Sequence, residues 1–407
     1  MAAMMGVRVS SGARSGHSCA RVSRSSRSSR PSRVSVVASS AGHLSSSDLT
    51  FKGKPASSTC VVVLGPTGYI GKYTTRELIA RGYDVVAISR SKSGIGGAGD
   101  EQKVRDDLPG ATVVFGDATD KDSLKKAFQD IGKPVDAVVC CLASRTGGVE
   151  DSWLVDYQAT RNGLDVGLEF GMSHYVLLSA ICVQKPDLVF QKAKLKFEQE
   201  LVDASSASDG KLTYSIVRPT AFFKSLAGQV EVVRGGGPYV MFGNGELCAC
   251  KPISERDLAA FISNGVDDET YYNKILPIGG PGEALTPKQQ GAILFEKFGI
   301  EKPFYVTPPI QIMDVVIKGL DAVAGWFPEN KSLEDAAEFG KIGRYYAAES
   351  MLVLDETTGD YDANATPSFG NDTLEAFFEA AVKDPEVLKA QALGDQAVFG
   401  VGKGEEV

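Results

Sequence analysis

The stretch Thr59-Cys-Val-Val-Val-Leu-Gly-Pro-Thr-Gly-Tyr-Ile-Gly71 decides the fold. Its apolar run, Cys60 to Leu64, predicts a buried strand, and the glycine-rich part predicts a turn that opens a helix reaching about Arg81. The first glycine permits a tight turn, the second lets a pyrophosphate approach the backbone, and the third lets the helix pack closely on the strand. Unpaired N–H groups and the helix dipole favour an anion at such a helix N-terminus.

This pattern predicts a dinucleotide cofactor whose pyrophosphate lies at the turn. A glycine-rich turn without a ligand is the alternative, and later features of the sequence favour the ligand. The residues predicted to contact the cofactor here are Gly65, Thr67, Gly68, Tyr69, Ile70 and Gly71.

A second predicted strand, 83–89, is followed by Arg90 rather than by an acid. Folds of this kind that bind NAD usually place an acid there to hold the ribose 2′-hydroxyl. A guanidinium instead grips a 2′-phosphate through paired hydrogen bonds, so the sequence predicts NADP(H). An exposed arginine without a ligand is the alternative. The glycine-rich, charged segment 93–106 predicts a mobile loop over the adenine side.

Strand patterns alternate with helical patterns along the chain and predict an α/β fold, a doubly wound parallel sheet with strand order 3-2-1-4-5-6. The remaining strands are predicted at 111–118, 135–144, 174–180 and 214–220, with helices between them that include 120–131 and 152–171. The carboxyl ends of these strands should meet at one binding crevice.

Residues at those strand ends are predicted to meet the cofactor. Asp117 and Ala118 are placed at the adenine edge, and the segment 143–148, which begins with Ala143, passes beside a ribose. Pro219 and Thr220 are placed to touch the nicotinamide carboxamide through backbone groups, although a simple strand-ending proline is the alternative.

Composition bounds the function. The 407 residues carry a formal charge of −8, and residues 1–47 hold seven arginines and no acid, as organelle transit peptides do. We interpret 1–47 as a chloroplast transit peptide and disordered linker, with a mitochondrial address as the alternative. Without these residues the formal charge becomes −8 − 7 = −15, which argues against a nucleic-acid partner. The cysteines lack zinc-site spacing, His174 is interpreted as a surface or packing residue rather than a magnesium ligand, and no metal is predicted.

Several of these features together resemble an atypical, extended short-chain dehydrogenase/reductase: the glycine turn, Asp117, Ser179, Lys194 and the run 218–220. Further blocks are similar to the plant-type divinyl chlorophyllide a 8-vinyl reductases. They are 218–245, 345–355 and 366–374, and the resemblance covers roughly residues 55–400. It implies NADPH, a plastid location, a tetrapyrrole substrate, and reduction of the 8-vinyl group of divinyl chlorophyllide or protochlorophyllide to ethyl.

The sequence departs from the wider superfamily at its usual Tyr-x-x-x-Lys pair, which reads Phe190-Gln-Lys-Ala-Lys194. A carbonyl reductase needs the phenol to protonate a developing alkoxide, so its loss argues against alcohol or ketone chemistry. Reduction of a conjugated vinyl group spreads charge into the macrocycle and needs no such donor. We predict that Lys194 binds the nicotinamide ribose and that the proton comes from water or another side chain. An exposed lysine on an amphipathic helix is the alternative, and Ser179 either bonds the substrate or only closes its strand.

The resemblance implies a small substrate lobe interleaved with the sheet. We assign 55–250 to the NADP-binding domain, 251–385 to this lobe and 386–407 to a loosely ordered tail. Aromatic residues are predicted to line a flat apolar pocket for the tetrapyrrole, with plain core as the alternative: Phe190, Phe222, Phe223 and Tyr239. The amphipathic helix 310–326 is predicted to dock onto the protein's own core, with peripheral contact to a plastid membrane as the alternative.

Two other functions remain open. One is a non-catalytic NADP(H)-binding regulator or accessory subunit, because such relatives also lack the tyrosine. The other is an isoflavone-reductase-like enzyme that relies on a lysine. The block 345–355 favours the pigment reductase over both.

Overall fold

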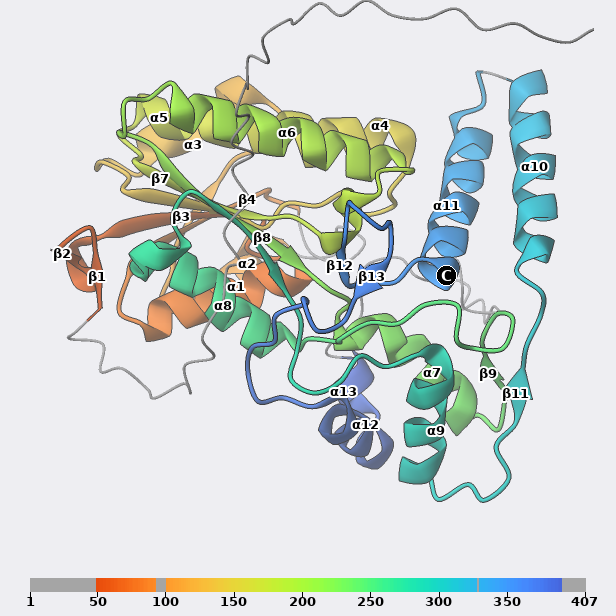
Figure 1. The fold of residues 1–407 in the computed structure, drawn as a ribbon. Helices are drawn as coiled ribbons and strands as arrows, with labels where there is room; N and C mark the ends of the chain where they lie inside the picture. The colour runs from red at the N-terminus through yellow and green to blue at the C-terminus, as the bar shows by residue number, and fades with distance from the viewer. Residues whose placement is uncertain (1–48, 93–99, 328, 390–407) are drawn as a thin grey trace, which may run out of the picture. The chain divides into compact units, whose positions relative to one another are not determined.

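A parallel sheet of seven strands organises the described part of the chain (Figure 1). The computed structural model describes residues 49–92, 100–327 and 329–389; the predicted transit peptide lies outside them. The strand order is β10-β8-β7-β6-β3-β4-β5, which confirms the predicted order and adds β10 beside the sixth strand. The strands are β3 (Cys60–Leu64), β4 (Asp84–Ser89), β5 (Thr112–Phe115), β6 (Ala137–Cys140), β7 (His174–Leu178), β8 (Thr213–Pro219) and β10 (Lys274–Ile278).

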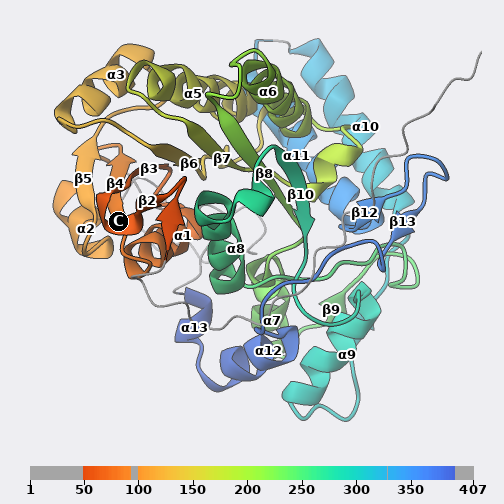
Figure 2. The ribbon, with the colours of Figure 1, turned by 60° about the vertical axis from the view of Figure 1, so that its left-hand side comes forward.

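Helices cover both faces of this sheet (Figure 1, Figure 2). Alternate residues of β3 divide between two cores: Val61 and Val63 join one, and Val62 and Leu64 join the other. The first face carries α1 (Tyr69–Ala80), α2 (Glu101–Asp107) and α8 (Glu255–Asp267), and the second carries α3 (Lys121–Asp130), α5 (Thr160–Glu169) and α6 (Val189–Ser206). The doubly wound α/β prediction is therefore confirmed.

Two local predictions need correction. Helix α2 begins inside the segment predicted as a loop, because the Asp100 side chain caps it by accepting a hydrogen bond from Lys103 N at 2.9 Å. The helix predicted at 152–171 is continuous but changes its winding: α4 (Val149–Asp151) leads into a π-helical stretch, η3 (Ser152–Ala159), and then into α5. Such stretches are rare and often lie at functional sites.

Elements beyond the sheet build an apolar cluster that is separate from the two cores on the faces of the sheet; we call it the second apolar cluster. It joins α7 (Ala227–Arg234), β9 (Tyr239–Val240), α9 (Pro287–Lys297), β11 (Tyr305–Val306), α12 (Leu374–Lys383) and α13 (Glu386–Lys389). Leu388 of α13 is buried in it, so the predicted loose tail is wrong for 386–389, and the rest of that tail lies outside the described residues. Short pairs complete the strands: β1 (Thr50–Phe51) with β2 (Lys54–Pro55), and β12 (Val353–Leu354) with β13 (Tyr361–Asp362).

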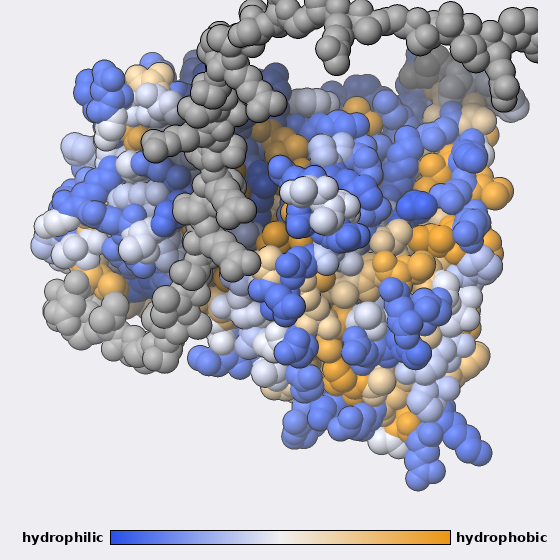
Figure 3. All heavy atoms as spheres, viewed as in Figure 1, coloured by the Kyte–Doolittle hydropathy of each residue, from blue (hydrophilic) through white to orange (hydrophobic). Residues whose placement is uncertain are grey.

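Helix α10 (Gln311–Trp326) packs against α11 (Lys331–Ala348) in a helical pair (Figure 1). Ile317 is its buried residue. The apolar residues on its other side are exposed, and hydrophobic residues gather along this side of the molecule in Figure 3. These exposed residues are Ile312, Val315, Val316, Val323 and Trp326. The prediction that this helix docks onto the protein's own core is therefore wrong for this face. None of the helices in the described ranges is both long and apolar enough to cross a bilayer.

Candidate active site

The turn between β3 and α1 has the geometry that its glycines predict. Gly65 has φ +76°, and a Cβ there would lie 3.0 Å from the carbonyl carbon of Cys141, directly after β6. A Cβ on Gly71 would lie 2.0 Å from the carbonyl oxygen of Gly65, so helix and strand meet with no room for a side chain. The turn thus lies between β3 and β6, where the strand order reverses and α/β folds bind their ligands.

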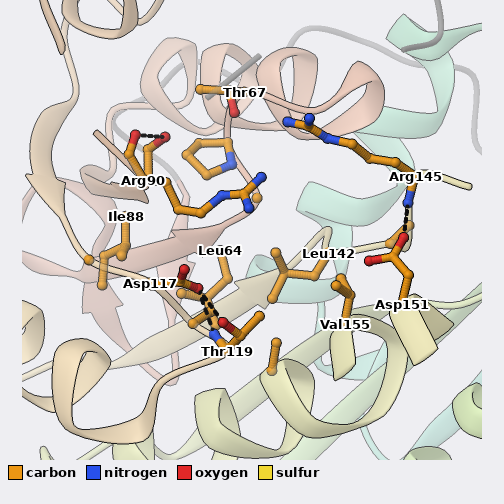
Figure 4. A pocket seen from close by; sticks show the side chains of 17 residues that line it. Leu64, Thr67, Ile88, Arg90, Asp117, Thr119, Leu142, Arg145, Asp151 and Val155 are labelled. Atoms are coloured by element: carbon orange, nitrogen blue, oxygen red, sulfur yellow. Dashed lines mark hydrogen bonds between the residues drawn. The ribbon is translucent and has the colours of Figure 1, made fainter. Parts of the chain in front are cut away.

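A pocket opens at this edge of the sheet (Figure 4). The Arg90 side chain points into it from the end of β4. Asp117 also lines it, and one of its carboxylate oxygens accepts hydrogen bonds from N–H (2.9 Å) and Oγ1 (2.7 Å) of Thr119. The predicted residues that the structure brings together in this pocket are Gly65, Thr67, Arg90, Asp117, Ala118 and Ala143.

Arg145 lines the same pocket from the segment after β6; it lies in the stretch predicted to pass beside the ribose but was not singled out as a cofactor contact. The backbone N–H of Arg145 donates a hydrogen bond to Asp151 Oδ2 at 2.9 Å (Figure 4). The strand-end rule that selected Ala143 could have found it, because it stands two residues further on. The pocket therefore contains two guanidinium groups, which suit a phosphorylated nucleotide.

Other predicted cofactor contacts point elsewhere. The side chain of Ile70 is buried in the core beneath α1, and Tyr69 donates its hydroxyl to Glu255 Oε2 at 2.9 Å. Thr220 N–H is donated to Ile278 O at 2.9 Å, and its hydroxyl is donated to the carbonyl of Lys251. Because β10 already uses the backbone N–H of Thr220, that donor is not available to the carboxamide, and the backbone contact of Pro219 and Thr220 with the carboxamide stays a prediction. Pro219 has no N–H to offer.

Lys194 is buried rather than exposed, which removes the alternative reading of it as a surface lysine. Its Nζ lies 2.9 Å from Asp156 Oδ1, and the two side chains are 10% and 1% exposed. Burial alone lowers the pKa of Lys194, but the Asp156 carboxylate offsets this and holds the pKa above its usual value. The ammonium is therefore a permanent charge at neutral pH, suited to electrostatic work rather than to proton donation.

Ser179, at the end of β7, belongs to a second buried charge pair. Its hydroxyl donates to Glu198 of α6, and Arg218 Nε lies 3.2 Å from both oxygens of that carboxylate. Because the hydroxyl hydrogen is committed to Glu198, Ser179 can only accept a hydrogen bond from a ligand.

The aromatic residues predicted to line the tetrapyrrole pocket divide into two groups. Phe223 and Tyr239 are 3% and 2% exposed and pack inside the second apolar cluster, so the prediction is wrong for them. Phe190 and Phe222 are only partly buried and keep some accessible surface. Aromatic side chains at such spacing become part of the hydrophobic core when another layer of helices packs over them.

Of the two roles predicted for His174, surface residue or packing residue, the structure shows the second. His174 is fully buried, stacks on Tyr272 with ring centroids 4.2 Å apart, and bonds Thr213 Oγ1 and Gly265 O. Burial lowers its pKa to about 3, so the ring is neutral at physiological pH. Across the described ranges, no three or more His, Cys, Asp or Glu side chains are grouped so that they could hold a metal ion.

The fold, the glycine turn and the two arginines define the class: an NAD(P)H-binding protein with a Rossmann-type sheet. A family model described as NAD(P)H-binding matches residues 65–269, half of the chain. The fold is also that of the UDP-glucose 4-epimerase of Thermotoga maritima, with a TM-score of 0.55 at 16% identity over 80% of this chain and 98% of that one.

Curated relatives define the particular family. The chain is 54% identical to the divinyl chlorophyllide a 8-vinyl-reductase, chloroplastic, of Cucumis sativus, over 94% of this chain and 90% of the relative. It is 57% identical to the Zea mays protein of the same name, over 87% of this chain and 86% of that relative. The chain therefore belongs to the divinyl chlorophyllide a 8-vinyl-reductase family.

Proposed function

We propose that this protein is a chloroplast oxidoreductase that uses NADPH to reduce the 8-vinyl group of divinyl chlorophyllide a to ethyl in chlorophyll synthesis. The observation that carries the proposal is the 54–57% identity to reductases of that name over nearly their whole length. The extension to divinyl protochlorophyllide rests on the shared macrocycle alone.

Residues of this chain that line the pocket fit NADPH. The turn 65–71 offers N–H groups at the start of α1, whose cap Gly68 has no side chain to compete for them. Arg90 faces the pocket from the position where it can pair with a 2′-phosphate, and Asp117 and Ala143 line the nucleoside side. When bound, the cofactor supplies the hydride.

Lys194 and Ser179 are proposed as the catalytic residues beside the nicotinamide. The permanent charge of Lys194 favours negative charge that develops in the reduced macrocycle. The Ser179 hydroxyl is held by its hydrogen bond to Glu198, and it orients a donor group of the bound ligand by accepting a hydrogen bond from it. Position 190 is a phenylalanine, so the site has no phenol at the position of the superfamily's usual proton donor.

The proposal is tested by incubating the recombinant protein with NADPH and divinyl chlorophyllide a. Loss of the conjugated vinyl group should move the Soret absorption band to shorter wavelength as NADPH is consumed. Tight NADPH binding with no spectral shift would favour the regulator or accessory subunit instead.

The domain assignment is also a proposal. Residues 55–250 hold the cofactor and 251–385 build the substrate lobe. The lobe is interleaved with the sheet because β10 and α8, which belong to its sequence range, pack with the sheet.

We also propose a peripheral contact with the plastid membrane through the exposed stripe of α10. At about 100° per residue the exposed apolar residues Ile312, Val315, Val316, Val323 and Trp326 fall on one side of this helix. The acids of this helix face the other way: Asp314 pairs with Arg344, and Asp321 with Lys341, both on α11. An apolar stripe that ends in an aromatic residue suits the boundary between headgroups and acyl chains, where the pigment substrate dissolves.

A further inference from the structure

One buried lysine has no hydrogen-bond partner. Lys224 lies in the short 3₁₀ turn Phe223–Leu226 after β8 and is 3% exposed. Among the described residues, its Nζ finds no hydrogen-bond acceptor. It lies instead 4.4 Å from the ring centroid of Tyr69. A buried ammonium without a hydrogen-bond partner costs free energy, which the face of an aromatic ring offsets only in part, so its retention calls for a reason.

Neither of the charged groups around Lys224 makes a hydrogen bond to its ammonium. Lys72 of α1 is a second cation, and it disfavours the ammonium. Glu255 of α8 is the acid that favours it, but one oxygen of that carboxylate already accepts the Tyr69 hydroxyl at 2.9 Å. Burial first, and Lys72 second, lower the pKa of Lys224 to about 7.

The position of Lys224 indicates which kind of ligand could bind its ammonium. Tyr69 is the first residue of α1, the helix whose N-terminus faces the crevice. The ammonium of Lys224 therefore stands beside the positive end of a helix dipole and near Lys72. A ligand that complements an unpartnered ammonium beside a helix N-terminus is an anion.

We propose that Lys224 is an anion-binding residue of the crevice and that its ammonium binds an oxyanion of a ligand. Two ligands of the proposed function, on which this inference rests, carry such a group. One is NADPH, through its pyrophosphate. The other is the pigment in its free-acid form, through its propionate carboxylate. Nothing in the sequence patterns pointed to this residue.

The test compares K224M, which keeps the length of the side chain, with K224R, which restores the charge, and with K211M, which removes an exposed lysine as a control. Dissociation constants are measured for NADPH, for divinyl chlorophyllide a and for its methyl ester. If the pyrophosphate is the ligand, K224M weakens NADPH binding about 10-fold or more, K224R recovers part of it, and both pigments bind as before. If the carboxylate is the ligand, NADPH binding is unchanged and only the free acid loses about 10-fold or more, down to the affinity of the ester.

A K224M protein that binds all three ligands like the wild type would overturn the proposal. Circular dichroism and the melting temperature establish that each variant is folded, and K224Q replaces K224M if that variant does not fold. Because these are binding measurements, they remain informative if the wild type fails to reduce the pigment. Failure of the proposed function and failure of this inference are therefore separate outcomes.

Discussion

Arg90 is the residue that we propose distinguishes NADP(H) from NAD(H). It replaces the acid that would hold a ribose 2′-hydroxyl, and the structure places its side chain in the pocket rather than away from it. Arg145 lines the same pocket from the neighbouring strand end. Cofactor preference should therefore depend on Arg90, while the glycine turn binds the pyrophosphate that both cofactors share.

We expect R90Q to lose affinity for NADPH and to keep its affinity for NADH. A charge-assisted hydrogen bond to a phosphate is worth about 1.5–3 kcal/mol, so the dissociation constant of NADPH should rise by roughly 10- to 100-fold. Titration of each cofactor by fluorescence measures both values, and NADH serves as the internal control. Equal losses for the two cofactors would mean that Arg90 does not read the 2′-phosphate.

The pair of Lys194 and Asp156 should dominate the stability of the site. D156N leaves a buried ammonium unpaired, and we expect the free energy of unfolding to fall by about 3–5 kcal/mol. The double variant D156N/K194M should lose less than the sum of the two single variants, because neither charge is left alone. Urea unfolding measures these values. D165N is the matched control, since Asp165 pairs with Arg161 and Lys121 at the surface and should cost about 1 kcal/mol or less.

Lys224 should make stability depend on pH. Its folded pKa of about 7 lies below the ordinary lysine value of about 10.4, so between these values the unfolded chain binds more protons. The free energy of unfolding should therefore rise with pH above 7, by up to about 1.4 kcal/mol per pH unit from this residue. The contribution is lost as pH falls through 7. Lys72 and Tyr69 on α1 and Glu255 on α8 face the same group, so the measurement is the difference between wild type and K224M from pH 7 to 9. An unchanged slope in K224M would contradict the lowered pKa.

Elements built on local patterns were predictable, and those that depend on what covers them were not. The strands and the glycine turn follow from apolar runs and from glycine and proline residues within about ten positions. The charge pair of Lys194 with Asp156 joins residues 38 positions apart (194 − 156), and no local pattern indicates it. The same limit explains Phe223 and Tyr239, whose spacing fits a pocket or a core equally well. Helix α2 was missed although Asp100 is a good cap, because the glycines before it dominated the interpretation.

Helix α10 shows this limit most clearly, because its periodicity indicates an apolar face and cannot say what that face meets. We expect V315E/V316E to lose binding to vesicles that contain anionic lipid, while V232E keeps it. Val232 lies on α7, is 44% exposed, and is the matched control. Co-sedimentation with the vesicles measures binding, and placing two carboxylates on the stripe opposes both apolar burial and anionic headgroups.

Equal vesicle binding by V315E/V316E and wild type would refute this contact. Sedimentation velocity tests whether a second copy of the chain, rather than a membrane, binds the exposed stripe of α10. A wild type that is dimeric without lipid, beside a monomeric V315E/V316E, would assign the stripe to a second copy of the chain.

At the scale of the whole molecule, the described residues form a parallel sheet with a pocket at the carboxyl ends of its strands. The sheet has helices on both faces, and the pocket is lined from β3, β4 and the segments after β5 and β6. The remainder beyond residue 47 carries a formal charge of −15, so the cations of the crevice, and not the net charge, must attract an anionic nucleotide.

The last prediction concerns how much of the chain the activity needs. We expect a chain of residues 48–389 to fold, to bind NADPH with the affinity of the full chain, and to reduce the pigment with the same kcat/KM. The reason is that the second apolar cluster closes at Leu388, while the sheet begins at β3. A chain that ends at Asp372 is the contrast, because it lacks α12 and with it the buried Phe377 and Phe378, each worth about 3–5 kcal/mol. Kinetics and thermal unfolding of the two truncated proteins measure the outcome. If the 48–389 chain binds NADPH but no longer reduces the pigment, residues outside this range contribute to the substrate site, and the proposed domain assignment is wrong.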